Sequence, residues 1–315
     1  MIRPKLTILP MVLFFATASF FTTAIAQESV FKVDVRLVRL LVTVKDSAGA
    51  LVGSLNREAF SIVDNGVRQE VALFERHTEQ PLSIALLVDT SASTGIELKY
   101  ELDSVSRFLR AAFREGNPDD AIALYSFNWQ VTLNSSFTKR LSRLESGLKQ
   151  LKSEGGTSMY DAIYLAARDL ESRDGRHVIV VVTDGGDTTS AKTFNDALQE
   201  THLADAILYP VVVIPIRNQA GRNTGGEHAL TTLAASTGGR LFLPAPGAEL
   251  DSAFSDILRE LRTQYLVGFY PKAVPLTKNA FHALKVTVTP PGLRVLTRNG
   301  YYGEFEESTA RPRGR

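Results

Sequence analysis

Five side chains that carry oxygen atoms occur in three short segments of the chain. They are Asp89, Ser91 and Ser93 in the first segment, Thr157 in the second and Asp184 in the third. A divalent cation such as Mg²⁺ binds about six oxygen atoms at about 2.1 Å and readily keeps water among them. Two carboxylates would balance its charge, three hydroxyls would fill most of its coordination sphere, and one open position could accept a carboxylate. The pattern therefore predicts a Mg²⁺ site, with Mn²⁺ and Ca²⁺ as alternatives.

The same residues fit enzyme chemistry poorly. A phosphatase of the haloacid dehalogenase type needs a second aspartate, its general acid, two positions after the first, and Ser91 stands there. The chain has no G-x-S-x-G, G-x-x-x-x-G-K-[ST] or G-x-G-x-x-G segment. With no cysteine it also has no disulfides, thiolate metal sites or cysteine nucleophiles. We therefore expect no enzymatic activity. Because Ser, Thr and Asp also cap helices, a structural protein without metal is the alternative interpretation.

Strand and helix patterns alternate between residues 81 and 263. Uninterrupted apolar runs at 84–88, 178–183 and 207–214 are typical of strands buried on both faces. Further strands are expected at 121–127, in a hairpin with 130–137, and at 240–243. Apolar residues at helical spacing predict helices at 98–112, 141–151, 160–170, 193–201, 228–237 and 249–263. The prediction is a doubly wound, mostly parallel sheet with helices on both faces, in which ligands bind beyond the carboxyl ends of the strands.

The order of these motifs resembles the von Willebrand factor type A domain over about residues 80–263. The matching elements are Asp89-Thr90-Ser91-Ala92-Ser93, Gly156-Thr157 and Thr183-Asp184-Gly185, which in that family form the metal-ion-dependent adhesion site. The resemblance implies that Ser91, Ser93 and Thr157 are hydroxyl ligands. It also implies that Asp89 and Asp184 bind the metal directly or through water. The flanking segments look like those of an uncharacterised group of such proteins in acidobacteria.

The flanks of this domain have strand patterns. A length of 315 residues favours about two domains. Before the α/β part, we expect a strand in the alternating residues 31–44 and a hairpin of strands 60–63 and 67–74 around Asn65-Gly66. After it, we expect strands at 265–270, 282–289 and 293–297. We expect the β segment 27–80 to pair with the β segment 264–303 in one small β-sandwich-like domain, with residues 81–263 inserted in it. Two separate β units are the alternative. Residues 304–315 are expected to be a flexible tail.

The first 26 residues have the features of a signal peptide. Arg3 and Lys5 precede an apolar run at 6–21, and Ala24-Ile25-Ala26 is a small-x-small cleavage pattern. Retention as an anchor is the alternative, although a run of 16 residues is shorter than the about 20 apolar residues that span a bilayer. No later run reaches spanning length, so the protein is expected to be exported, to the periplasm or outside the cell, with no membrane span after cleavage. The net charge of +1 gives no indication of nucleic-acid binding.

Three further residues are candidates for a ligand rim around the metal. Trp129 is the only tryptophan and stands in the expected turn after residue 127, whereas Arg217 and Arg222 belong to a loop expected at residues 217–226. A tryptophan folded onto its own hairpin and a plain connecting loop are the alternatives. Together these features predict an exported, non-enzymatic binding protein whose partner presents an Asp or Glu carboxylate to the metal. The competing hypothesis is a subunit that docks or assembles a separate envelope enzyme.

Overall fold

The computed structural model describes residues 37–76, 80–95, 98–213, 223–274 and 280–303. Every element below belongs to one compact unit, residues 35–315. The expected signal peptide and the expected tail lie outside the described residues. Among the helices that are described, none is long and apolar enough to cross a membrane.

The central sheet has five strands in the order β7-β6-β5-β8-β9. They are β5 (Leu82–Asp89), β6 (Ala121–Phe127), β7 (Val131–Thr138), β8 (Arg176–Thr183) and β9 (Ala206–Val212). β5 pairs in parallel with β6 and β8, β8 pairs in parallel with β9, and β7 is antiparallel to β6. Every residue of the four parallel strands is buried, which explains their uninterrupted apolar runs. The predicted doubly wound, mostly parallel sheet is confirmed.

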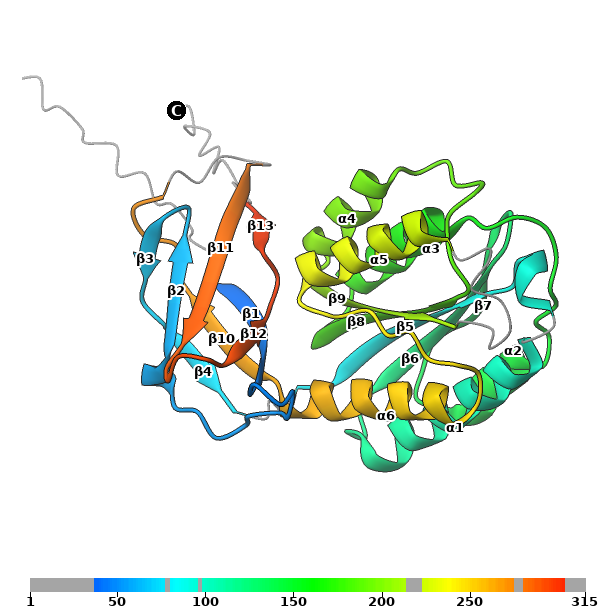
Figure 1. The fold of residues 1–315 in the computed structure, drawn as a ribbon, viewed down its shortest axis with the longest axis horizontal. Helices are drawn as coiled ribbons and strands as arrows, with labels where there is room; N and C mark the ends of the chain where they lie inside the picture. Colours follow the sequence, from blue (N-terminus) through cyan, green and yellow to red (C-terminus); the bar gives the residue numbers. More distant parts are fainter. Residues whose placement is uncertain (1–36, 77–79, 96–97, 214–222, 275–279, 304–315) are drawn as a thin grey trace, which may run out of the picture. The chain divides into compact units, whose positions relative to one another are not determined.

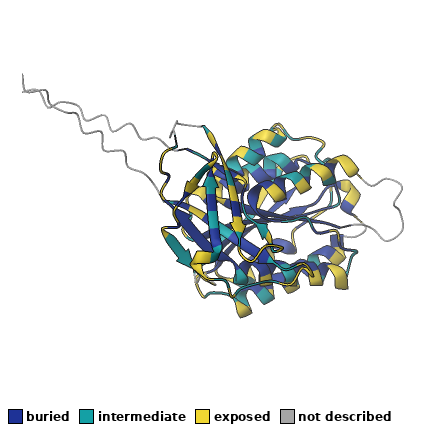
Figure 2. Ribbon diagram, turned by 60° about the vertical axis from the view of Figure 1, so that its left-hand side comes forward, coloured by how far each residue is buried: buried dark blue, intermediate teal, exposed yellow. Residues whose placement is uncertain are grey.

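Helices cover both faces of this sheet (Figure 1). They are α1 (Leu98–Glu115), α2 (Leu141–Leu148), α3 (Met159–Glu171), α4 (Phe194–Leu203), α5 (Thr224–Thr237) and α6 (Ala248–Thr263). Helices α1, α2 and α6 pack on the face that includes Ile84 and Leu86. Helices α3, α4 and α5 pack on the opposite face, with Ala85 and Leu87. Figure 2 shows the buried strands between helices whose outer sides are exposed.

The flanking segments form two four-stranded antiparallel sheets with a shared apolar core, which we call the β sandwich. One sheet contains β12 (Arg294–Leu296), β1 (Val38–Lys45), β10 (Tyr265–Phe269) and β4 (Leu73–Glu75), in that order. The other contains β13 (Gly300–Tyr302), β11 (Phe281–Val288), β2 (Phe60–Asp64) and β3 (Val67–Gln69), with the short 3₁₀ helix η1 (Arg57–Ala59) before β2. Each sheet therefore combines strands from both flanks, with β1 paired to β10 and β2 to β11.

Two elements of the flanks differ from the sequence predictions. The segment expected to be one strand at 67–74 contains two strands, β3 and β4, which belong to different sheets. The chain crosses between the sheets at residues 70–72, where Val71 is buried in the shared core and Ala72 N–H donates to Gly268 O at 2.7 Å. Strand β13 was not expected, and the expected strand residues 31–36 lie outside the described residues.

Two elements of the α/β part also differ. The short strand expected at 240–243 is reduced to a single bridge between Phe242 and Val211. Helix α5 begins at Thr224 rather than at residue 228, because the side chain of Asn223 accepts a hydrogen bond from Gly226 N–H and caps the helix there. The last residues of the loop expected at 217–226 are therefore helical.

Polar contacts join the β sandwich to the α/β part. Glu260 on α6 binds Lys45 of β1 and Arg240, each at 2.6 Å, and its side chain is 3% exposed. Gln264 donates to the hydroxyl of Thr43 at 3.2 Å. Arg298 forms an ion pair with Asp205. Lys45 and Thr43 belong to β1, and Arg298 also donates to the backbone oxygen of Arg39 in β1. These contacts therefore hold the inserted part against strand β1.

Candidate metal site

Asp89 and Thr183 meet at the carboxyl edge of the central sheet. Val88 of β5 lies opposite Val182 of β8 in the parallel register, so the next residue of each strand lies beside the other. Thr183 Oγ1 donates to Asp89 Oδ2 at 2.6 Å, and both residues are fully buried. The carboxylate is therefore oriented by a neighbouring strand before any ligand binds.

The first loop turns back on Asp89. Ser91 N–H donates to Asp89 Oδ1 at 2.8 Å, so each carboxylate oxygen accepts one hydrogen bond. The hydroxyls of Ser91 and Ser93 lie 3.0 Å apart, with Ser91 buried and Ser93 exposed. Ser91 precedes the short 3₁₀ helix η2 (Ala92–Gly95), and Ser93 lies within it. The structure thus brings three of the predicted ligand residues into one small turn.

Hydrogen bonds hold the three predicted loops together in pairs. Ala92 N–H donates to Gly155 O at 3.0 Å and Glu154 N–H to Thr90 O at 2.8 Å, which joins the first loop to the second. Thr157 O accepts hydrogen bonds from the backbone N–H groups of residues 188 and 189, at 2.8 and 3.1 Å, which joins the second loop to the third. The bond between Thr183 and Asp89 joins the third loop to the first.

Thr157 is anchored through its backbone. The N–H group of Thr157 donates to the hydroxyl of Thr188 at 2.8 Å, and Thr157 is 6% exposed. Among the described residues, none forms a hydrogen bond with the Thr157 hydroxyl. That hydroxyl is therefore available to a ligand, and its loss would leave the backbone anchors in place.

Within the part of the chain that the structure describes, no side chain balances the charge of Asp89. Burial raises the pKa of the Asp89 carboxyl from its ordinary value to about 6, against the hydrogen bonds from Thr183 and Ser91, and the charge of Asp184 adds to the rise. Asp184 is half-buried, and none of the ion pairs among the described residues involves either aspartate. Two neighbouring carboxylates with nearby hydroxyls are the donor set that a hard divalent cation prefers, so these residues fit such an ion.

Sequence reasoning missed the residues that position this set. Thr183 and Thr188 hold Asp89 and Thr157 in place, and only the adjacency of Thr183 to Asp184 in the motif hinted at this. Asp187 is a further residue that positions the loops. Its carboxylate accepts from Tyr160 N–H at 3.1 Å and from the Ser190 hydroxyl at 2.5 Å, so it ties the start of α3 to the third loop. No group of three or more His, Cys, Asp or Glu suited to a metal occurs in the described part of the chain.

Of the three predicted rim residues, the structure describes Trp129 and not Arg217 or Arg222. Trp129 is 57% exposed in the turn between β6 and β7, and it lies so close to Gly155 that a Cβ there would meet its indole ring. The same turn is tied to the Thr157 loop by the hydrogen bond from Ser158 N–H to Asn128 O, 2.6 Å long. Trp129 therefore borders the predicted site. Arg217 and Arg222 lie outside the described residues.

Comparison with known proteins agrees with this geometry. The family described as von Willebrand factor type A domain matches residues 84–186, which include all five predicted ligand residues. The chain contains a von Willebrand factor type A domain. The match spans about a third of the sequence, so the name A domain is used below for the α/β part alone. No curated protein sequence matches the chain.

Several solved structures are similar to parts of the chain. The vWF domain of the type V pili tip protein Mfa5 from Porphyromonas gingivalis is 16% identical, with a TM-score of 0.48, over 57% of this chain and 94% of that one. The conserved hypothetical protein BatB from Bacteroides thetaiotaomicron is 16% identical, with a TM-score of 0.46, over 57% and 98%. A von Willebrand factor type A structure from Catenulispora acidiphila is 10% identical, with a TM-score of 0.49, over 89% and 76%.

Proposed function

We propose that this protein is an exported, non-enzymatic binding protein that grips a partner through a divalent cation. Asp89, Ser91, Ser93, Thr157 and Asp184 would hold the cation, with Mg²⁺ as the expected ion and Mn²⁺ or Ca²⁺ as alternatives. Bound there, the cation would supply an electrophilic centre for one further oxygen anion. The partner would be a protein that presents an Asp or Glu carboxylate.

One observation carries this proposal. Asp89 is fully buried where three loops meet, beside a second carboxylate, and no cationic side chain among the described residues pairs with it. A buried carboxylate without a counter-charge costs several kcal/mol of stability unless it is neutralised. A divalent cation would offset this cost, and the hydroxyls of Ser91, Ser93 and Thr157 would supply neutral ligands that leave part of its charge available.

The hydrogen bonds of the loops support a role in positioning. Each oxygen of Asp89 already accepts one bond, from Thr183 or Ser91, and still has a lone pair left for a metal or for a metal-bound water. The Thr157 loop is joined to both neighbouring loops, so a change at one ligand can reach the others. Trp129 beside this loop offers an exposed aromatic surface to the segment of the partner that carries the carboxylate.

The metal is tested first by thermal unfolding in Mg²⁺ and in chelator. A metal ion that binds the folded state and not the unfolded state must raise the melting temperature. Asp89→Asn should abolish the rise, and Asp103→Asn, an exposed aspartate on α1 without a bonding partner among the described residues, should keep it. Equal melting temperatures of the wild type in Mg²⁺, Mn²⁺, Ca²⁺ and chelator would refute the metal site.

The partner is tested by affinity capture from the envelope fraction of the source cell. Wild-type protein should retain a partner in Mg²⁺ and release it in chelator, and Asp89→Asn should retain none. Mutating surface Asp and Glu residues of the captured protein should locate the carboxylate. Capture that is equal with chelator and with Asp89→Asn would contradict a metal-mediated contact.

A further inference from the structure

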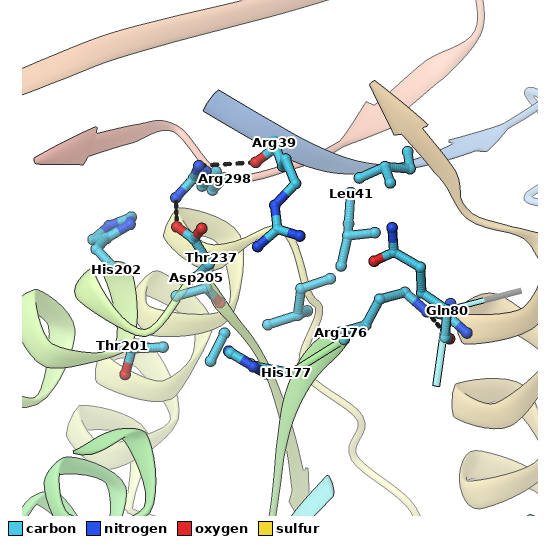
Figure 3. Close-up of a pocket in the computed structure, with 14 residues that line it drawn as sticks. Arg39, Leu41, Gln80, Arg176, His177, Thr201, His202, Asp205, Thr237 and Arg298 are labelled. Carbon is cyan, nitrogen blue, oxygen red and sulfur yellow. Dashed lines mark hydrogen bonds and ion pairs between the residues drawn. The ribbon is translucent and has the colours of Figure 1, made fainter. Parts of the chain in front are cut away.

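A cavity lies at the opposite end of the central sheet from the three loops that carry the predicted metal ligands, which we call the metal loops. It has a volume of about 40 Å³ and is bordered by the first residues of β8 and β9, the end of α4, strand β1 and the segment after β12 (Figure 3). Two of the metal loops follow the last residues of β5 and β8, so strand β8 runs from one site to the other. The cavity is independent of the proposed metal site.

The lining of this cavity carries excess positive charge. Arg39, Arg176 and Arg298 line it, and Asp205 is the one carboxylate among the lining residues. Arg298 pairs with Asp205, whereas Arg176 donates only to the neutral carbonyls of Gln80 and Leu261. Figure 3 shows the Arg39 side chain extending from β1 into the space between Asp205 and Arg176. Two of the three guanidinium groups thus lack a carboxylate in ion-pair contact among the described residues.

The charge of Arg176 is costly where it lies. The residue is 6% exposed, and burial lowers the pKa of its guanidinium to about 10, although the nearby carboxylate of Asp120 opposes this change. Asp120 is outside the lining and accepts from Leu82 N–H at 2.7 Å. An anion in the cavity would reduce this cost, because it would stabilise the charged form of the arginine.

Two buried polar atoms of the lining also lack partners among the described residues. Arg298 Nε and His202 Nδ1 are buried without a hydrogen bond in the described part of the chain. The side chain of Arg298 is 9% exposed, and its terminal nitrogens bind Asp205 and Arg39 O. An arginine Nε–H can only donate, so what it lacks is an acceptor atom. An oxygen-bearing ligand would satisfy it and, with the appropriate tautomer, His202 as well.

We propose that this cavity binds one small oxyanion, of the size of phosphate or of a carboxylate group. A volume of about 40 Å³ holds about three water molecules, which is room for one such group and not for a nucleotide or a sugar. The anion would contact Arg39 and Arg298 of the β sandwich and Arg176 and His202 of the A domain. It would therefore act as an effector that strengthens the contact between the two parts.

The test measures anion binding by the full chain in buffer without divalent cations. Inorganic phosphate and acetate are compared with chloride at equal ionic strength, by calorimetry and by melting temperature. Phosphate, acetate or both should bind with one-to-one stoichiometry and raise the melting temperature, and tripolyphosphate should not bind. Which of the two binds identifies the ligand as a phosphate or a carboxylate group.

Variants of one residue make the assignment specific. Arg39 is exposed and its guanidinium has no bonding partner among the described residues, so Arg39→Gln should fold and weaken anion binding roughly tenfold. Arg39→Lys should weaken it less. Arg294→Gln, which removes the same charge from the neighbouring strand β12, should bind as the wild type does. Effects of phosphate and acetate no larger than that of chloride, or equal losses in Arg39→Gln and Arg294→Gln, would overturn the proposal.

Discussion

Thr183 and Asp89 are 94 positions apart in the sequence, and the hydroxyl of Thr183 donates to Asp89 Oδ2 at 2.6 Å. The two residues end neighbouring parallel strands, so the register of β5 and β8 brings them together. The bond fixes the orientation of a fully buried carboxylate at the point where three loops meet. It also makes Thr183 a positioning residue of the candidate metal site, although it is not one of the predicted ligands.

Replacing Thr183 by valine should destabilise the protein. Valine preserves the shape of the side chain but leaves a buried carboxylate oxygen without its donor, a change that costs about 1–3 kcal/mol. The free energy of unfolding in urea, measured in chelator, should fall by that amount in Thr183→Val. Thr183→Ser keeps the hydroxyl and should lose less. A valine variant as stable as the wild type would show that the hydrogen bond contributes nothing to folding.

Thr157→Ala should separate metal binding from stability. The backbone bonds of Thr157 to residues 188 and 189 remain in the variant, so its free energy of unfolding in chelator should change by less than about 1 kcal/mol. The rise in melting temperature on adding Mg²⁺ should become smaller, because one hydroxyl ligand is lost. Calorimetric titration with Mg²⁺ checks the same point. If the alanine variant responds to Mg²⁺ as the wild type does, Thr157 is not a ligand.

His202 should make stability decrease at acidic pH. It lies near Arg298 and Asp205 and contacts the rings of Phe281 and Tyr302. Burial, and then the charge of Arg298, lower the pKa of His202 to about 4, against the opposing charge of Asp205. An unfolded histidine takes up its proton near pH 6.5, so between about pH 6.5 and 4 the unfolded state binds more protons and gains stability relative to the folded state.

The measurement compares the wild type with His202→Gln in urea, in chloride buffer with chelator, from neutral pH down to about pH 4. The loss due to His202 should reach about 2–3 kcal/mol over this range and be absent in the variant. The raised pKa of Asp89 acts in the opposite direction over an overlapping range, but both proteins contain it. Parallel pH profiles of the two proteins would mean that His202 titrates alike in the folded and unfolded states.

A buried polar cluster should stabilise the β sandwich. Tyr301 donates to Asp64 Oδ2 at 2.7 Å, and His282 Nδ1 lies 3.0 Å from Asp64 Oδ1. Burial and the charge of Asp64 raise the pKa of the Tyr301 phenol, which keeps it a donor. Tyr301→Phe should therefore lower the free energy of unfolding by about 1–3 kcal/mol. Tyr302→Phe is the matched control, since its hydroxyl has no hydrogen bond among the described residues. Equal losses in the two variants would exclude a specific contribution from the cluster.

Much of the A domain follows from local patterns in the sequence. Strands buried on both faces are almost wholly apolar, as in residues 178–183. Helices such as α1 have apolar residues three or four positions apart. Parallel strands bring the loops at their carboxyl ends to one edge of the sheet, which is why Asp89, Thr157 and Asp184 could be predicted to lie near one another. The ligand role of these residues stays a prediction.

Patterns in the flanks were less informative, because neither flank forms a core by itself. The segment 67–74 was expected to be one strand, yet β3 pairs with β2 and β4 pairs with β10, in different sheets. Strand β13 is only three residues long. The hydroxyl of its buried Tyr301 donates to Asp64, which lies 237 positions earlier in the sequence. Short strands of this kind are defined by their partners rather than by their own composition.

By itself, the sequence determined which segments are strands and helices in the A domain and which oxygen-bearing residues end its strands. Periodicity reports on how a segment is buried, and burial decides local structure. Only the tertiary structure decided that Thr183 orients Asp89, that Thr188 anchors Thr157, and that Arg39, Arg176 and Arg298 surround one cavity. The physical reason is that hydrogen bonds and charges act over a few ångströms in space, and distance along the chain carries no information about which side chains come that close.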